Sequence, residues 1–65
     1  MSEITHINNY LVMNGKKYKV VLDDSPDDVI TGIETQNNQT VIISKYRGLE
    51  NIWSLEEVTL IELAN

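Results

Sequence analysis

Apolar and polar residues alternate on both sides of Asn14-Gly15, which predicts two β-strands joined by a tight turn. Asn-Gly favours a two-residue type I′ turn, because both central residues of that turn have positive φ. The pairing places Met13 opposite Lys16 and Leu11 opposite Tyr18, and we expect it to continue to Asn9 with Val20 and Ile7 with Leu22. Side chains alternate faces along a strand, so one face becomes the predicted core face. It comprises Ile7, Leu11, Met13, Tyr18, Val20 and Leu22.

The middle of the chain predicts two further strands. Residues 23–28 hold four aspartates and the single proline, which predicts an exposed loop. Residues 29–35 are rich in β-branched side chains, and Gly32 within them indicates a bulge or a sharp bend. After a turn at 36–39, residues 40–46 form the most apolar segment, which we expect to be a central strand buried on both faces near Val41–Ile43. Residues 47–51 are expected to turn the chain again.

The C-terminal segment begins with a short strand at Ile52-Trp53 and then allows two interpretations. Ser54 and Glu57 match a capping box, which predicts at least one helical turn. The apolar residues that follow form no single helical stripe, and the β-branched residues among 58–61 favour a strand. We therefore expect a turn of helix at 54–57 and then a strand. The alternative is a C-terminal helix over 55–63 packed on a four- or five-stranded antiparallel sheet.

This order of short strands, with Trp53, the polar segment 54–57 and then the strand 58–62, resembles SH3-like small barrels over residues 7–63. The resemblance implies an all-β fold of five or six antiparallel strands with a 3₁₀ turn before the last strand. The acidic and aromatic motif and the paired tryptophan of signalling SH3 domains are missing, so binding of proline-rich peptides is not implied. The glycine-centred motif of the ribosomal and elongation-factor branch is also not evident. A fold alone does not supply a function.

Composition narrows the classes that the chain can belong to. Sixty-five residues predict one domain, occupying 1–65. The chain has no cysteine, which excludes disulfides and thiolate metal sites and favours a reducing compartment. We see no signal peptide and no apolar run of the roughly 20 residues that span a membrane, so we expect a cytoplasmic protein without membrane contact. The small, acidic, cysteine-free chain is similar to many phage, prophage and plasmid proteins.

The basic residues form two groups that suggest a binding face. Lys16, Lys17 and Lys19 lie at the first hairpin, and Lys45 and Arg47 flank Tyr46. If both groups meet in space near Tyr10 and Tyr46, they would form a positive face with aromatic character, suited to single-stranded nucleic acid or to an acidic protein. Scattered, the lysines would be solubilising residues. The tentative binding residues are Tyr10, Lys16, Lys17, Lys19, Lys45, Tyr46 and Arg47.

Catalytic and cofactor chemistry is not indicated. His6, the only histidine, has no nucleophile or carboxylate at a recognised spacing, so we expect it to lie on the surface or in an edge strand. The spacing from Asp23 to Glu34 partly matches a calcium loop, but Asp28 stands where the sharp turn needs glycine and the flanks favour strands. Trp53 is expected to anchor the core rather than an interface. We predict no enzyme activity, metal, cofactor or small-molecule substrate.

Three functions remain open. The first is a protein-interaction domain that binds a partner, or itself as a homodimer, through a β edge or the aromatic and basic residues. The outer face of the first hairpin (Tyr10, Val12, Val21) is apolar enough for a dimer. The second is a nucleic-acid-binding barrel, although a net charge of −5 disfavours contact with phosphates. The third is an acidic inhibitor that mimics nucleic acid and presents 23–28 and 50–57.

Overall fold

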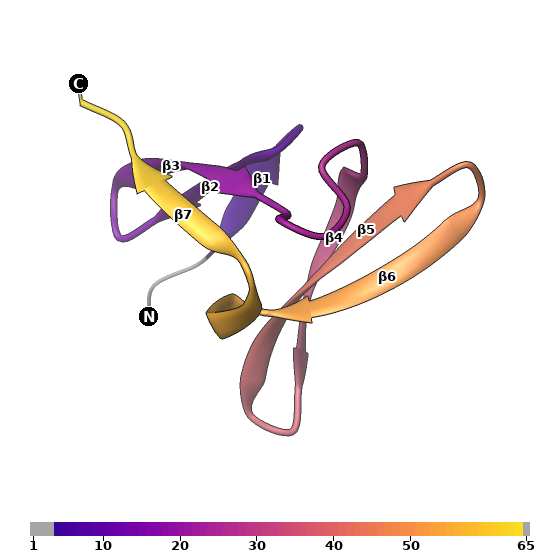
Figure 1. Cartoon of the computed structure of the whole chain (residues 1–65). Coiled ribbons are helices and arrows are strands. Elements are labelled where there is room, and N and C mark those ends of the chain that lie inside the picture. Colours follow the sequence, from indigo (N-terminus) through magenta and orange to yellow (C-terminus); the bar gives the residue numbers. More distant parts are fainter. Residues whose placement is uncertain (1–3, 65) are drawn as a thin grey trace.

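The structure is a computed structural model that describes residues 4–64, and these residues form an all-β fold (Figure 1). Seven strands and one turn of 3₁₀ helix, η1, follow each other along this part of the chain. The elements are β1 (Thr5–Ile7), β2 (Tyr10–Met13), β3 (Lys16–Val21), β4 (Val29–Gln36), β5 (Gln39–Tyr46), β6 (Leu49–Ser54), η1 (Leu55–Glu57) and β7 (Thr59–Glu62). The predicted all-β class and the 3₁₀ turn before the last strand are confirmed.

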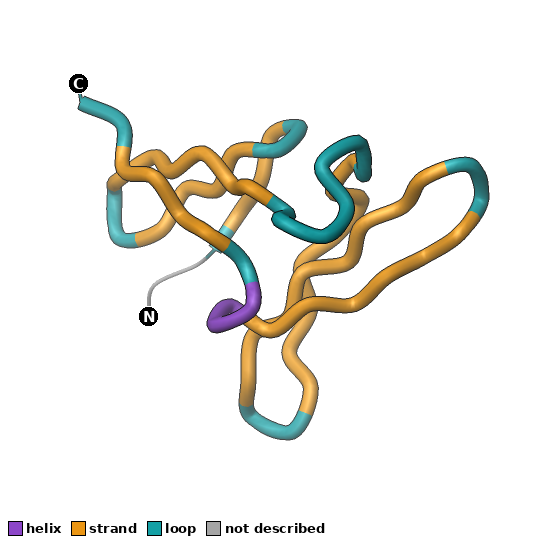
Figure 2. Tube along the Cα trace, in the orientation of Figure 1, coloured by secondary structure: helices purple, strands orange, loops and turns teal. Residues whose placement is uncertain are grey.

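The strands form two antiparallel sheets, which we call sheet A and sheet B. Sheet A has the order β1-β2-β3-β7, and sheet B has the order β4-β5-β6. Within residues 4–64, strand pairing does not join the two sheets into one closed barrel, so the barrel implied by the resemblance is not detected. Figure 2 shows the loop between β3 and β4 crossing from one sheet to the other, while η1 makes the second crossing. The alternative C-terminal helix over 55–63 is wrong, because β7 pairs with β3.

The first hairpin has the predicted turn and central register. Leu11 pairs with Tyr18 and Met13 pairs with Lys16 across Asn14-Gly15, whose φ angles are 52° and 76°. The predicted pairing of Ile7 with Leu22 is wrong. Asn8 adopts a φ of 52° and turns the chain, so that Ile7 pairs with Tyr10 in an additional hairpin. The predicted five or six strands are therefore too few, because the Asn8-Asn9 turn has the alternating pattern of a strand interior.

Sheet B follows the sequence prediction closely, except at its last turn. The register shifts between Ile30 and Gly32, which confirms the predicted bulge. The turn after β4 lies at Asn37-Asn38, and β5 is the central strand with Val41–Ile43 buried. The predicted turn at 47–51 is too long. Only Arg47-Gly48 forms the loop, and Leu49 already pairs with Tyr46 as the first residue of β6.

The core lies between the inner faces of the two sheets and contains Trp53. Six buried side chains form it: Leu11, Val20, Leu22, Ile30, Ile42 and Trp53. Trp53 is 8% exposed, so it is a core residue, as predicted. Ile7 is 64% exposed, and Met13 and Tyr18 are only half-buried, so the predicted core face was too wide. Ile7 is exposed because the Asn8 turn makes it pair with Tyr10, whereas the prediction paired it with Leu22.

Residues at the start of η1 stabilise the corner between β6 and β7. The backbone N–H of Ser54 donates to the Glu57 carboxylate at 2.9 Å. That bond is one half of a capping box, in which the third residue of the helix reaches back to the cap. Leu55 and Val58 pack against the core on either side of this turn. The capping signal in the sequence thus marked the corner correctly.

Candidate functional site

A network of polar side chains, most of them buried, lies on the inner face of sheet B beside Trp53. The indole Nε1–H of Trp53 donates to Ser44 Oγ at 2.8 Å, and the Ser44 hydroxyl donates to Asp28 Oδ2 at 2.6 Å. The Asn51 amide donates to the same Asp28 oxygen at 2.9 Å. Ser44 is fully buried and Asp28 almost so. Trp53, Ser44 and Asn51 each donate to an acceptor within this network. A buried polar network stabilises a fold only when its donors have acceptors in this way.

Asn9 links the two sheets through the backbone next to Asp28. Its side-chain amide donates to the Asp28 carbonyl at 2.9 Å and accepts from the Ile30 N–H at 2.9 Å. The side chain thereby occupies the place that a neighbouring strand would take along the start of β4. Its own carbonyl also accepts from the Val20 N–H at 2.9 Å. Asn9 therefore ties sheet A to sheet B where no strand pair does so.

The acidic loop between β3 and β4 is not uniformly exposed. Asp23, Asp24 and Asp27 lie on the surface, whereas Asp28 points inward. Asp23 accepts a hydrogen bond of 2.9 Å from the Thr59 hydroxyl of β7, which fixes the start of the loop. The expectation of four exposed aspartates was wrong, because Asp28 supplies the acceptor that Ser44 and Asn51 need. The loop thus has a structural side chain as well as a charged surface.

The first group of predicted binding residues lies on sheet A. Tyr10 pairs with Lys19 and Val12 pairs with Lys17, so Tyr10, Lys17 and Lys19 share the outer face of the sheet. Lys16 lies at the turn, and its Nζ is 3.8 Å from the Glu62 carboxylate in an exposed ion pair. Exposed ion pairs of this kind contribute little to stability.

The second group lies at the end of the β5–β6 hairpin. The Arg47 guanidinium carbon is 5.2 Å from the centroid of the Tyr46 ring, within the range of a cation–π contact. Lys45 lies on the outer face of sheet B, where it pairs with Val29 on one side and Glu50 on the other. Tyr46, Arg47 and Lys45 are all exposed.

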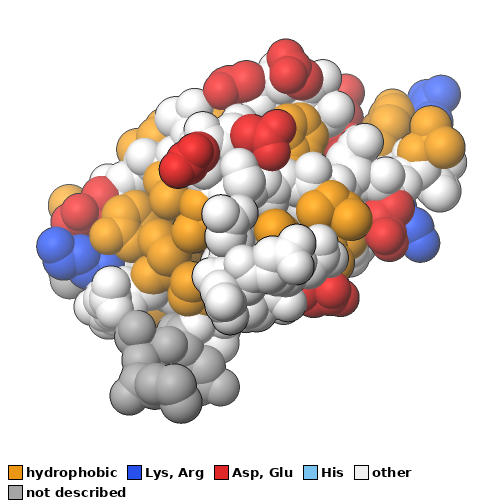
Figure 3. Space-filling model, turned by 90° about the horizontal axis from the view of Figure 1, so that it is seen from below, with side chains coloured by type: hydrophobic (Ala, Val, Ile, Leu, Met, Phe, Trp, Pro, Cys, Tyr) orange, Lys and Arg blue, Asp and Glu red, His pale blue; other side chains and the backbone are white. Residues whose placement is uncertain are grey.

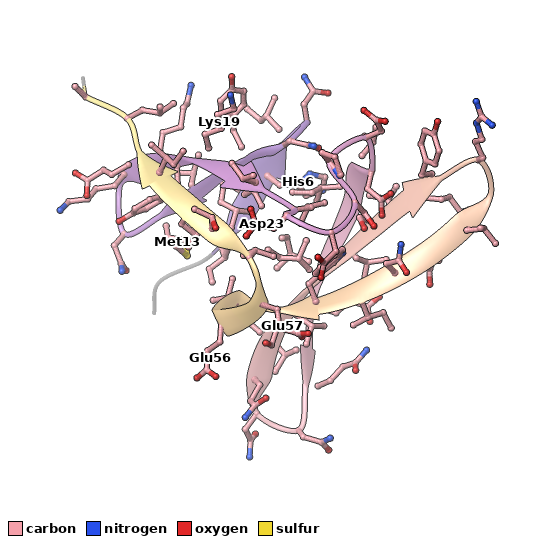
Figure 4. The ribbon with its side chains drawn as sticks, viewed as in Figure 1. His6, Met13, Lys19, Asp23, Glu56 and Glu57 are labelled. Atoms are coloured by element: carbon pink, nitrogen blue, oxygen red, sulfur yellow. The ribbon has the colours of Figure 1, made fainter. Side chains whose placement is uncertain are left out.

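The structure does not bring the two basic groups together. Figure 1 shows the β2–β3 turn at the left end of the molecule and the β5–β6 turn at the right end. On the face shown in Figure 3, blue side chains appear only at the two ends, and acidic side chains lie between them. Figure 4 shows Lys19 projecting above sheet A, on the side opposite to Glu56. A single positive face that uses both groups is therefore not formed.

Arg47 occupies a backbone conformation that its residue type disfavours. Its φ is 51°, while the other non-glycine residues with positive φ among residues 4–64 are all asparagines: Asn8, Asn14, Asn37 and Asn38. Asparagine tolerates this region better than a long side chain does. We expect Arg47→Asn to raise the free energy of unfolding by about 0.5 kcal/mol, since relief of the backbone exceeds the lost cation–π contact. The reciprocal Asn14→Arg change should lower it, and urea unfolding of both variants measures the difference.

The most exposed apolar side chains near this turn belong to β6, and they were not among the predicted binding residues. Leu49 is 72% exposed and Ile52 is 54% exposed, and both lie on the last strand of sheet B. The two-residue loop at Arg47-Gly48 was the signal that could have found them, because it places Leu49 directly opposite Tyr46. We call the side of residues 49–54 that faces away from β5, with the side chains on both faces of the strand, the β6 edge.

Features that could support other chemistry are few in the described part of the chain. An open pocket of about 280 Å³ is lined by Gln39, Thr40, Ser54, Leu55 and Glu56. His6 lies in β1, an edge strand, and its Nδ1 is buried with no hydrogen-bond partner among residues 4–64. Across those same residues, no group of three His, Asp or Glu side chains is arranged to hold a metal ion.

Comparisons with known proteins add no relative to this picture. The sequence matches no family model and no curated protein, and the structure matches no solved structure. Within residues 4–64, no helix has the length and apolar character needed to cross a membrane. The geometry of the described residues is therefore what supports a function.

Proposed function

We propose that this chain is a non-enzymatic protein-interaction domain that binds through the β6 edge. The observation that carries the proposal is the pair of exposed side chains Leu49 and Ile52 on a strand at the edge of sheet B. An edge strand offers unpaired backbone N–H and C=O groups to another chain, and natural proteins usually protect such edges with charge, proline or a bulge. Residues 49–54 contain one charged residue, Glu50, and no proline.

Both faces of the β6 edge offer apolar surface. Leu49 pairs with Tyr46 on the face that also carries Ser44, while Ile52 pairs with Ile43 on the outer face. Val29 adds a half-exposed side chain to that outer face, beside Lys45. A strand added beside β6 would cover side chains on both faces, whereas a partner lying flat on the sheet would cover only one. Strand addition, with backbone hydrogen bonds and alternating side-chain contacts, fits this arrangement best.

Tyr46 and Arg47 extend the binding surface beyond the strand. The two side chains stack at the end of the β5–β6 hairpin, next to Leu49. Tyrosine and arginine are the residue types enriched where binding energy concentrates in interfaces. The left-handed backbone of Arg47 is maintained at an energetic cost, which supports a role for its side chain at the surface.

The non-enzymatic part of the proposal is supported by the contacts of the polar side chains. Asp28, Ser44 and Asn51 are engaged with one another, and the Ser44 hydroxyl already donates to a carboxylate. The open pocket has one ionisable lining residue, Glu56. The Ser44 hydroxyl has the Asp28 carboxylate within hydrogen-bond reach, but Ser44 is fully buried and so is not accessible to a substrate.

The proposal predicts that a change at the β6 edge removes binding without unfolding the domain. Leu49→Thr combined with Ile52→Thr keeps β propensity and removes apolar surface, so we expect at least tenfold less of any co-purifying protein in affinity capture from the native source. Ile61→Thr is the matched control, because Ile61 is a half-exposed isoleucine on β7 of sheet A. Loss of the same proteins with Ile61→Thr, and not with the double variant, would contradict the proposal.

The two alternative functions have no comparable observation in their favour. Nucleic-acid binding relied on one positive face, and the structure places its residues at two ends of the molecule. The acidic-inhibitor alternative relied on the loop, where Asp28 is buried. Both stay predictions that a titration with single-stranded oligonucleotides at low salt, and capture with a basic partner, would test.

A further inference from the structure

Among the sheet edges of the described structure, β6 is the one left suited to pairing. In sheet A, β1 has three residues, and β7 has four and ends in Glu62, which forms an ion pair with Lys16. In sheet B, the start of β4 is occupied by the Asn9 side chain and is followed by the bulge at Gly32. The six residues of β6 have none of these protections.

We propose that the occupant of the β6 edge is a second copy of this chain, paired antiparallel through β6 and centred on Ile52. The inference rests on the proposed interaction function and names its partner. A two-fold axis perpendicular to sheet B would pair β6 with β6 of the second copy. The outer faces of the two copies of sheet B would then lie on the same side of the joined sheet. Residues that stand opposite each other then share a face, and the centres to compare are Glu50, Asn51, Ile52 and Trp53. The Trp53 centre places the exposed Ile52 opposite the polar Ser54 and is therefore disfavoured.

The charge and the apolar residues of β6 select among these centres. A pair centred on Glu50 places two carboxylates directly opposite each other, which is unfavourable. A pair centred on Asn51 places each Glu50 against Ile52 of the second copy. A pair centred on Ile52 places the two isoleucines together, each Glu50 opposite the Ser54 hydroxyl, and Leu49 beside Leu55 of the second copy. Only the last centre pairs the exposed Ile52 with an apolar side chain, while Leu49 comes near η1 of the second copy just beyond the end of the strand.

The resulting assembly closes on itself and joins the two copies of sheet B into one six-stranded sheet. Because both copies use the same edge, β6, the pairing closes on itself and forms a dimer rather than a fibre. Each chain has a net charge of −5, and Glu50 also comes near the acidic η1 of the second copy. Electrostatic repulsion therefore opposes association, and salt should strengthen the dimer by screening it.

The absence of native cysteine allows a direct test of this register. Paired residues across an antiparallel ladder have Cα atoms about 4.5–5.5 Å apart, which suits a disulfide. Under mild oxidation we expect Ile52→Cys to form a disulfide-linked dimer at least tenfold faster than Ile61→Cys, an exposed position on β7. Excess cysteine-free chain should slow this reaction, and added salt should speed it.

Other results would overturn the inference in distinguishable ways. Equal rates for Ile52→Cys and Ile61→Cys would show that β6 does not pair with itself. Faster linkage of Glu50→Cys, or preferred linkage of a Glu50→Cys chain to an Ile52→Cys chain, would contradict the register. The wild-type chain could sediment as a monomer while the double variant Leu49→Thr, Ile52→Thr fails to capture a protein that the wild-type chain captures. In that case the proposed dimer is wrong and the proposed function stands.

Discussion

Asp28→Ala should destabilise the domain by about 3 kcal/mol and lower its Tm by roughly 15 °C, measured by circular dichroism during thermal unfolding. The carboxylate is buried and accepts hydrogen bonds from Ser44 and Asn51. Alanine removes the oxygen that accepts both hydrogen bonds and leaves the fully buried Ser44 hydroxyl without a partner for its proton. A domain of this size has only a few kcal/mol of stability, so the loss is a large part of the total.

Two variants separate the hydrogen bonds of Asp28 from its charge. Asp24→Ala removes an exposed carboxylate from the same loop and should change Tm by less than 2 °C. Asp28→Asn keeps an oxygen where Oδ2 stands, and both hydrogen bonds converge on that atom, so it should cost less than half as much as alanine. Equal losses for Asp24→Ala and Asp28→Ala would show that net charge, and not the network, governs stability.

The turns and strands of this chain were predictable where local chemistry determined them. Asn14-Gly15 fixed the register of β2 with β3 because glycine and asparagine accept positive φ. Gly32 marked the bulge, and the capping pair Ser54 and Glu57 marked the corner before β7. Each of these signals acts between residues near each other in the chain, so no knowledge of the tertiary structure was needed.

The polar contacts between distant residues were not predictable in this way. Asn9 bonds to Asp28 and Ile30, about twenty residues away, and nothing in its local sequence distinguishes it from a turn asparagine. Asp28 is the last of four aspartates in a polar loop, so its composition indicated exposure. Such residues are recognised only when the fold shows which donors need an acceptor.

The candidate site was predicted in part, for a related reason. Lys45, Tyr46 and Arg47 were singled out by residue type, and they lie next to the surface that we propose. Leu49 and Ile52 were missed because the turn was drawn too long and β6 too short, so neither residue was assigned to an exposed edge. Which edge of a sheet stays unpaired is a property of the topology, and the pattern of one strand does not contain it.

Trp53→Ala should leave the domain largely unfolded at 25 °C, with loss of the β signal in circular dichroism. Truncation of a buried tryptophan costs about 3–5 kcal/mol, which is comparable to the whole stability expected for 65 residues. Trp53 contributes twice, because its ring packs in the core and its Nε1–H donates to Ser44. A native spectrum for the alanine variant would show that the remaining core suffices and that Trp53 is not its anchor.

Trp53→Phe reduces the packing loss, since it keeps an aromatic ring in the core while it removes the indole donor and the second ring. We expect it to cost about 1–2 kcal/mol in urea unfolding. Ser44→Ala removes the acceptor of that bond and the donor to Asp28 in one step. If the hydrogen bond between Trp53 and Ser44 stabilises the fold, the double variant should cost at least 0.5 kcal/mol less than the sum of the single variants, a difference of about the size expected for residues in contact. Additive costs would mean that the two side chains stabilise the domain independently, through packing alone.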